Sequence, residues 1–136
     1  MSVNEKNKAD NVLAFLAGSS FPCLAVPFLV LGIAMLVHPD QKVPPHSLLW
    51  GLPPVMGLWN MGLLKFSQMR RKDHFIAGVI IGLCFTTLGV ATGAPSELYN
   101  LQGNQKYMMI PIGVVSHSLI WGVIVYWVNG KLGVRN

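Results

Sequence analysis

The side chains best able to do chemistry in this chain lie inside an apolar stretch near its C-terminal end. In PIGVVSHSLIWG, residues 111–122, His117 is flanked by Ser116 and Ser118. An imidazole can carry a proton, ligate a metal or haem, or hydrogen-bond to a neighbouring helix. An unpaired buried polar group costs on the order of 1–3 kcal/mol, so we expect His117 to be neutral and to point toward polar partners.

Candidate partners lie at a similar depth in the other apolar stretches. We therefore predict a polar layer made of His117, Ser116, Asn60, Thr86 and Thr87. One interpretation is structural: His117 and Asn60 form a hydrogen bond between helices, worth about 0.6 kcal/mol. The other is functional: His117 is a proton carrier, a haem ligand or a substrate contact in a polar path.

The remaining chemical patterns are weaker. His38, Asp40 and His46 bracket a proline-rich segment and form a weak candidate metal site, because zinc usually takes four ligands. A haem held by two histidines is not expected, since His74 and the other histidines lie at the ends of apolar stretches rather than near the depth of His117. A haem or pigment held by His117 alone stays open, and no pattern specifies a cofactor.

Patterns typical of enzymes are missing from the sequence. There is no phosphate-binding glycine loop, HExxH motif or Ser-His-Asp pattern, and all five acidic residues lie outside the apolar stretches. We therefore expect no catalytic residue, and we favour a non-catalytic protein over an enzyme.

The elements that must position these groups are apolar and long. Just over half of the 136 residues are hydrophobic, only 11% are charged, and the mean hydropathy is +0.50. A water-exposed shell needs about 25% charged residues, so the outer surface should face lipid. We predict an all-α integral membrane protein, a single domain over residues 1–136 with four transmembrane helices in a bundle, at residues 12–37, 48–66, 75–94 and 108–128.

The basic residues predict the orientation of these spans. Eight of the ten lie in the N-terminal tail, the C-terminal tail and an inner basic loop at residues 67–74 with its flank. That loop region carries Lys65, Arg70, Arg71 and Lys72. By the positive-inside rule, both termini should be cytoplasmic or on the equivalent side. Because the charges do not form a stripe with interleaved aromatics, we expect no nucleic-acid partner.

A short internal similarity predicts two quasi-repeated helical hairpins. FLAG at residues 15–18 recurs as FIAG at 75–78, and LGIAM at 31–35 recurs as LGVAT at 88–92. Glycines in the second, third and fourth spans also favour close helix packing.

Three functional hypotheses follow from these patterns. The first is a non-catalytic anchor, assembly or accessory subunit of a membrane complex, whose partners are the bilayer and a larger complex or further copies of this chain. The alternative is a small oligomeric carrier or channel with a polar path near His117. The third is a membrane enzyme or redox protein acting on lipid or quinone.

Overall fold

The computed structural model describes residues 3–36 and 47–134, and every regular element within these two ranges is helical. This confirms the all-α prediction. In chain order the elements are α1 (Val3–Leu36), α2 (Ser47–Phe66), α3 (Arg71–Ala91), α4 (Ala94–Tyr99), the 3₁₀ turn η1 (Gly103–Met108), α5 (Met109–Leu119), the π-helical η2 (Ile120–Val125) and α6 (Tyr126–Lys131).

Three helical segments in this part of the chain are long and apolar enough to cross a membrane. They are Glu5–Phe28 within α1, Arg71–Ala91, which is α3, and Gly103–Lys131, which runs from η1 to α6. A multi-pass membrane protein is compatible with this finding. The predicted second span falls on α2, which is not one of the three.

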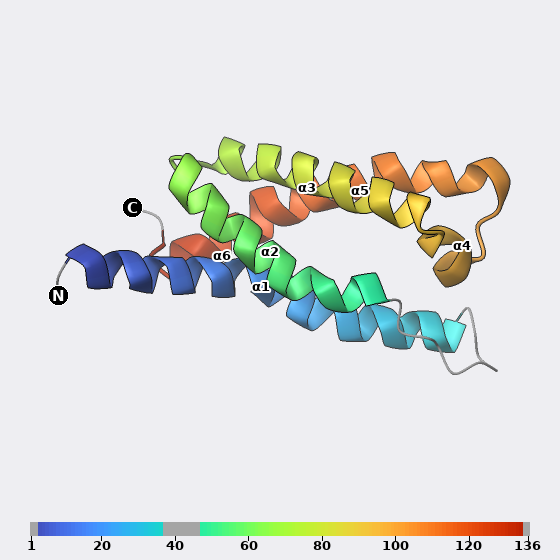
Figure 1. Ribbon diagram of the computed structural model, residues 1–136, viewed down its shortest axis with the longest axis horizontal. Helices are drawn as coiled ribbons and strands as arrows, with labels where there is room; N and C mark the ends of the chain where they lie inside the picture. Colours follow the sequence, from blue (N-terminus) through green and yellow to red (C-terminus); the bar gives the residue numbers. More distant parts are fainter. Residues whose placement is uncertain (1–2, 37–46, 135–136) are drawn as a thin grey trace.

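The long helices form two hairpins that lie along the same axis (Figure 1). In one hairpin α1 packs against α2, and in the other α3 packs against α5 and η2. The start of α1, the turn from α2 to α3 and the end of α6 lie at one end of the molecule, while α4 and η1 lie at the other. We call the first of these the terminal end.

The α1–α2 hairpin is packed through glycine. A Cβ atom on Gly18 would clash with the carbonyl oxygen of Met56, would lie 2.7 Å from Cβ of Asn60 and would be 3.1 Å from Cα of Gly57. Only a residue without a side chain therefore lets the two helices approach this closely. In apolar surroundings such close approach is a main source of helix–helix attraction, because dispersion contacts replace the missing hydrophobic force.

The α3–α5 hairpin repeats this contact. A Cβ atom on Gly78 would lie 2.6 Å from the carbonyl oxygen of His117, 2.6 Å from Cα of Ser118 and 2.9 Å from Cβ of Trp121. Gly78 follows Gly18 by 60 positions, and each of its three contacts follows its counterpart in the first hairpin by 61. The same three types of atom, a carbonyl oxygen, a Cα and a Cβ, occur in this order along the partner helix in both hairpins.

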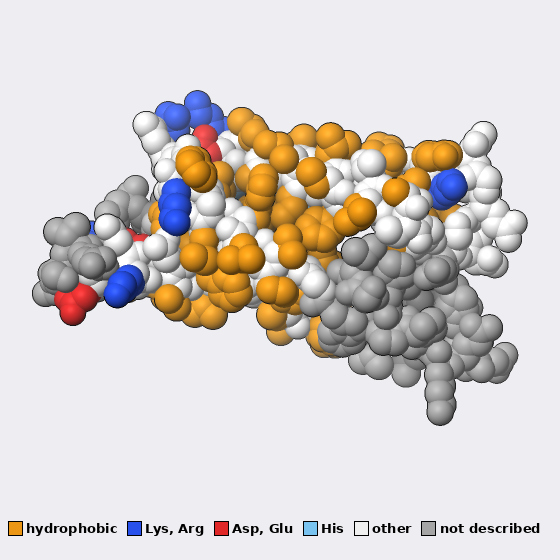
Figure 2. Space-filling view, viewed as in Figure 1, with side chains coloured by type: hydrophobic (Ala, Val, Ile, Leu, Met, Phe, Trp, Pro, Cys, Tyr) orange, Lys and Arg blue, Asp and Glu red, His pale blue; other side chains and the backbone are white. Residues whose placement is uncertain are grey.

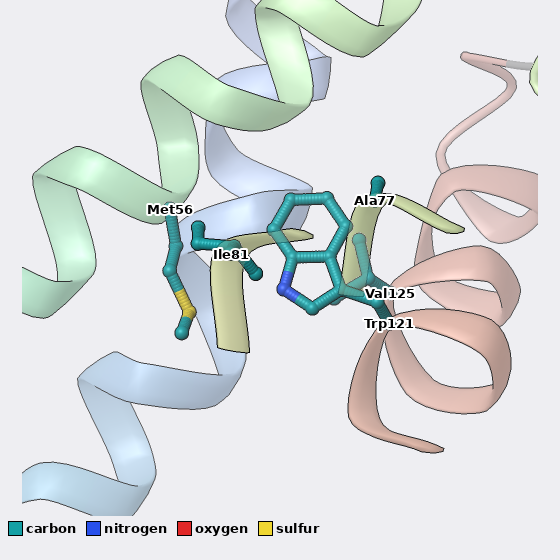
Figure 3. Packing of buried hydrophobic residues seen from close by; sticks show 5 residues of the cluster. All are labelled: Met56, Ala77, Ile81, Trp121 and Val125. Carbon is teal, nitrogen blue, oxygen red and sulfur yellow. The ribbon is translucent and has the colours of Figure 1, made fainter. Parts of the chain in front are cut away.

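Between the hairpins lies an apolar core centred on Trp121, which has no exposed surface. Figure 3 shows the indole ring among the side chains of Met56 from α2, Ala77 and Ile81 from α3, and Val125 from η2. A second, smaller cluster joins Ala14, Met69 and Val134. Met69 is buried at a left-handed φ of 54° in the turn after α2, so its side chain secures that turn to α1 and the C-terminal segment.

Candidate functional site

The most complete polar arrangement in the described residues is a pair of buried amides. Asn60 of α2 donates from Nδ2 to Oδ1 of Asn129 at 2.9 Å, and Asn129 of α6 donates from Nδ2 to Oδ1 of Asn60 at 3.2 Å. Both side chains are 0% exposed. Two buried amides that satisfy each other in this way avoid the cost of leaving a donor or acceptor unpaired.

Backbone carbonyls and a histidine extend the pair on both sides. Asn60 Nδ2 also donates to the Ala14 carbonyl oxygen of α1 at 2.7 Å. Asn129 Nδ2 lies 2.9 Å from Nε2 of His74, whose Nδ1 lies 3.1 Å from the carbonyl oxygen of Arg70. We call the three side chains Asn60, Asn129 and His74 the amide–histidine network. It connects α1, α2, α3 and α6.

The two carbonyl oxygens fix the orientation of every polar group between them. A carbonyl only accepts, so the Asn60 nitrogen must face Ala14, and the Asn129 oxygen must then face that nitrogen. This turns the Asn129 nitrogen toward His74, whose Nε2 accepts while Nδ1 carries the proton and donates to Arg70. The imidazole is therefore neutral and held in a single tautomer.

The surroundings of the network are apolar and well packed. His74 is 0% exposed, and its ring meets the Tyr126 ring edge-on, with centroids 5.4 Å apart and an interplanar angle of 83°. Each side-chain nitrogen and oxygen of the network has at least one hydrogen-bond partner within the protein. Its hydrogen bonds join side chains and backbone from four helices.

His117 lies elsewhere, in the interface between α5 and α3. Its Nδ1 donates to the Gly113 carbonyl oxygen at 2.7 Å within its own helix, and its ring stacks on Phe85 with centroids 6.4 Å apart. Gly82 makes room for it, because a Cβ atom there would lie 2.9 Å from Cβ of His117. The predicted hydrogen bond between His117 and Asn60 is not formed, since both side chains have other partners on other faces.

The predicted polar layer is divided among three environments. Asn60 belongs to the amide–histidine network, and Thr86 faces α5 and donates to the Gly82 carbonyl oxygen at 2.6 Å. Ser116 and Thr87 are exposed on the outer faces of their helices. Equal depth did not bring these residues together because adjacent positions on a helix diverge by about 100°.

His74 and Asn129 lie outside the predicted spans, because the helices extend beyond the apolar stretches at these ends. His74 was assigned to the inner loop, but α3 already begins at Arg71, so the turn between α2 and α3 is only Ser67–Arg70. Asn129 falls just beyond the predicted end of the fourth span, although α6 continues to Lys131. Asn129 follows the buried Trp121 and Val125 at intervals of four.

The basic residues of the predicted inner loop have different neighbours. Lys65 and Arg70 border a hollow at the turn, and Lys72 is exposed on α3. Arg71 donates from Nε to the Gly122 carbonyl oxygen in η2 at 3.3 Å, and its guanidinium lies 5.7 Å from the centroid of the Phe75 ring. Arg71 thereby gives a partner to a carbonyl of the π-helical turn.

The candidate metal site falls outside the described residues, since His38, Asp40 and His46 all lie within 37–46. Among the residues that are described, no group of three or more His, Cys, Asp or Glu is arranged to hold a metal ion. Comparison with known protein families, curated proteins and solved structures gave no match to this chain.

Proposed function

We propose that the chain crosses a membrane four times, with α2 as the additional span and both termini on the cytoplasmic or equivalent side. The arrangement of charge supports this topology. Lysine and arginine side chains gather toward the terminal end of the molecule, and the middle of the visible face is mostly hydrophobic (Figure 2). Lys106 lies in η1 at the other end. Short loops that carry lysine and arginine stay on the cytoplasmic side of the membrane. This distribution of charge therefore favours a cytoplasmic terminal end.

We also propose that the two hairpins are a tandem structural repeat. The contacts of Gly18 and Gly78, matched atom for atom at a nearly constant offset, support this beyond the short sequence similarity. Burial supports it as well: residues 14–18 and 74–78 share one pattern of buried, intermediate and exposed positions. Because each unit has two helices, both units enter the membrane from the same side. They are then related by an axis along the membrane normal.

Within the membrane we propose a non-catalytic role, as an anchor, assembly or accessory subunit of a larger complex or of an assembly of this chain. The observation that carries this proposal is that the buried amide and imidazole side chains of the network form hydrogen bonds to one another and to the backbone. In the amide–histidine network Asn60, Asn129 and His74 bond to one another. Thr86 and His117 bond to carbonyls of their own helices. The hydrogen bonds of the network therefore hold helices together, whereas those of Thr86 and His117 each stay within one helix.

The outward surface is the part of the molecule left for a partner. Most of each of the three candidate spans is not buried within this chain. Large apolar side chains such as Leu16, Leu83 and Val115 are about half exposed. A small bundle with this much apolar outer surface can bury part of it against another membrane protein, whose helices are as apolar as lipid but pack more closely.

A carrier or a membrane enzyme receives less support. A carrier needs a path lined by polar groups, but His117 and Asn60 lie in separate interfaces, and Thr87 and Ser116 face outward. An enzyme needs reacting groups near an accessible surface, whereas His74 is fully buried and bonded at both ring nitrogens.

Site-specific photo-cross-linking in intact membranes tests the accessory role. A photoreactive amino acid is placed at the outward-facing Leu16, Leu83 or Val115, and at the buried Ile81 as a matched control. We expect discrete higher-mass adducts from one or more outward positions, present in stoichiometric amounts, and none from Ile81. Recovery of the uncross-linked chain alone from all three outward positions would exclude the proposed role.

A further inference from the structure

An apolar groove runs between α2 and α3 near the terminal end of the molecule. It has a volume of about 370 Å³ and opens on the outer surface. Its walls are formed chiefly by three side chains from each helix, namely Trp59, Leu63 and Phe66 of α2 and Ile76, Ala77 and Ile80 of α3. In a membrane-embedded bundle this groove faces the hydrocarbon region.

A polar hollow at the turn between the two helices shares wall residues with the groove. The hollow has a volume of about 410 Å³, is lined by Lys65, Gln68 and Arg70, and shares Phe66, Ser67 and Asp73 with the groove. Because the two spaces have walls in common, one molecule with an apolar and a polar part can occupy both.

Two residues, Gly62 and Phe66, leave the groove accessible from outside the protein. Gly62 lies on its floor, and a Cβ atom built there would meet nothing within 4 Å. Phe66 lines both the groove and the hollow and is 90% exposed.

The charge at the polar end is net positive. Lys65 and Arg70 are exposed cations, with the Arg70 side chain 56% exposed. The single carboxylate in the hollow, Asp73, is only 15% exposed, and it accepts the Arg70 backbone N–H at 3.0 Å. Its nearest approach to the Arg70 side chain is 3.9 Å, so the guanidinium keeps donors available for a further anion.

We propose that the groove and the hollow together bind a phospholipid with an anionic headgroup. One acyl chain lies between α2 and α3, and the phosphate lies against Lys65 and Arg70. The chemistry is complementary at both ends: the apolar walls bury hydrocarbon, and the two cations meet a phosphate at the depth where headgroups lie. This site is independent of the accessory role proposed above and requires only that the chain is embedded in a bilayer.

Native mass spectrometry of the delipidated full chain in non-ionic detergent tests the headgroup. The protein is titrated separately with phosphatidylglycerol, phosphatidylcholine and phosphatidylethanolamine carrying the same acyl chains. We expect one phosphatidylglycerol to be retained in clear preference to the other two, and the preference to fall as salt is added. The double variant Lys65→Ala/Arg70→Ala should bind it on the order of tenfold more weakly.

The matched control is Lys8→Ala/Lys72→Ala, which removes the same net charge from exposed positions outside both spaces. It should leave the preference unchanged. Equal retention of the three lipids, or an equal loss in both double variants, would overturn the proposal. Retention of phosphatidylethanolamine as strong as that of phosphatidylglycerol would also overturn it.

Gly62→Leu tests the acyl groove. Its side chain has space to fill the groove and should weaken retention of every phospholipid, whereas Gly130→Leu, also at an open position but outside the groove, should not. Circular dichroism verifies that both variants keep their helices, and the exposed charge variants test the site even if Gly62→Leu does not fold. Unchanged lipid retention in a folded Gly62→Leu variant, or a groove filled by a second copy of the chain, contradicts the proposal.

Discussion

Asn60 and Asn129 lie 69 residues apart in the chain and donate a hydrogen bond to each other, at 2.9 and 3.2 Å. The pair connects the two hairpins, because Asn60 also donates to a backbone carbonyl of α1 and Asn129 also bonds to His74 of α3. One amide pair thus links four helices by hydrogen bonds near the terminal end.

Replacing Asn129 by leucine should lower the free energy of unfolding by about 2 kcal/mol, because it removes both hydrogen bonds to Asn60 and the one to Nε2 of His74. The loss is measured by unfolding in sodium dodecyl sulfate, followed by circular dichroism. Thr87→Leu, on the exposed face of α3, is the control and should change the stability little. The double variant Asn60→Leu/Asn129→Leu should lose less than the sum of the two single variants, since both remove the same contact. Strict additivity would mean that the pair is not coupled.

His74 should matter more for stability than His117. His74→Ala removes a fully buried ring and leaves a donor of Asn129 unpaired, which should cost about 2–3 kcal/mol. His117 bonds to a carbonyl of its own helix and is partly exposed, so His117→Ala should cost less than about 1 kcal/mol. Thermal unfolding of the two variants in one detergent compares them directly, and the opposite order would contradict the account.

The network also predicts the protonation of His74. Its Nδ1 donates to the Arg70 carbonyl and its Nε2 accepts from Asn129, so only the neutral Nδ1–H tautomer fits. Nitrogen-15 NMR of the labelled imidazole should report this single form in the folded protein at neutral pH. Observation of the Nε2–H tautomer or of an imidazolium would show that the amides are oriented the other way.

Gly78→Ala should destabilise the α3–α5 hairpin by about 1–3 kcal/mol, because the new methyl group would lie 2.6 Å from a backbone oxygen that cannot move independently of its helix. Gly89→Ala in the same helix meets its nearest atom at 3.9 Å and should instead stabilise by up to about 1 kcal/mol. Thermal unfolding measures both. If the hairpins pack equivalently, Gly18→Ala should behave as Gly78→Ala does, and a neutral Gly78→Ala would count against close packing there.

Composition and hydropathy were sufficient to predict an all-helical chain, because both depend on sums over many residues. The pairing of polar side chains was not predictable in this way, since it depends on where each helix begins, on its rotation and on its neighbours. His74 illustrates the first effect: the apolar run starts at Phe75, but Arg70 and Asp73 start the helix earlier through the Arg70 backbone N–H, which bonds to the Asp73 carboxylate. Ser116 and Thr87 illustrate the second, because they share a depth with His117 but not a face.

The contact between the hairpins was beyond sequence reasoning for a further reason. A π-helical segment, Ile120–Val125, changes the rotation of the last span between His117 and Asn129. The regular spacing of an α-helix therefore does not predict that His117 and Asn129 both face α3, at different depths.

The central claim is a bundle of four spans with both termini on one side, and cysteine labelling in sealed vesicles tests it most directly. Cys23 and Cys84 are replaced by serine, and single cysteines are introduced at Ser2, Gln68, Asn104 and Asn136 for reaction with an impermeant maleimide. The account predicts that positions 2, 68 and 136 react from the cytoplasmic side and position 104 from the opposite side only. Labelling of positions 2 and 136 from opposite sides, or of 68 and 104 from the same side, would contradict it.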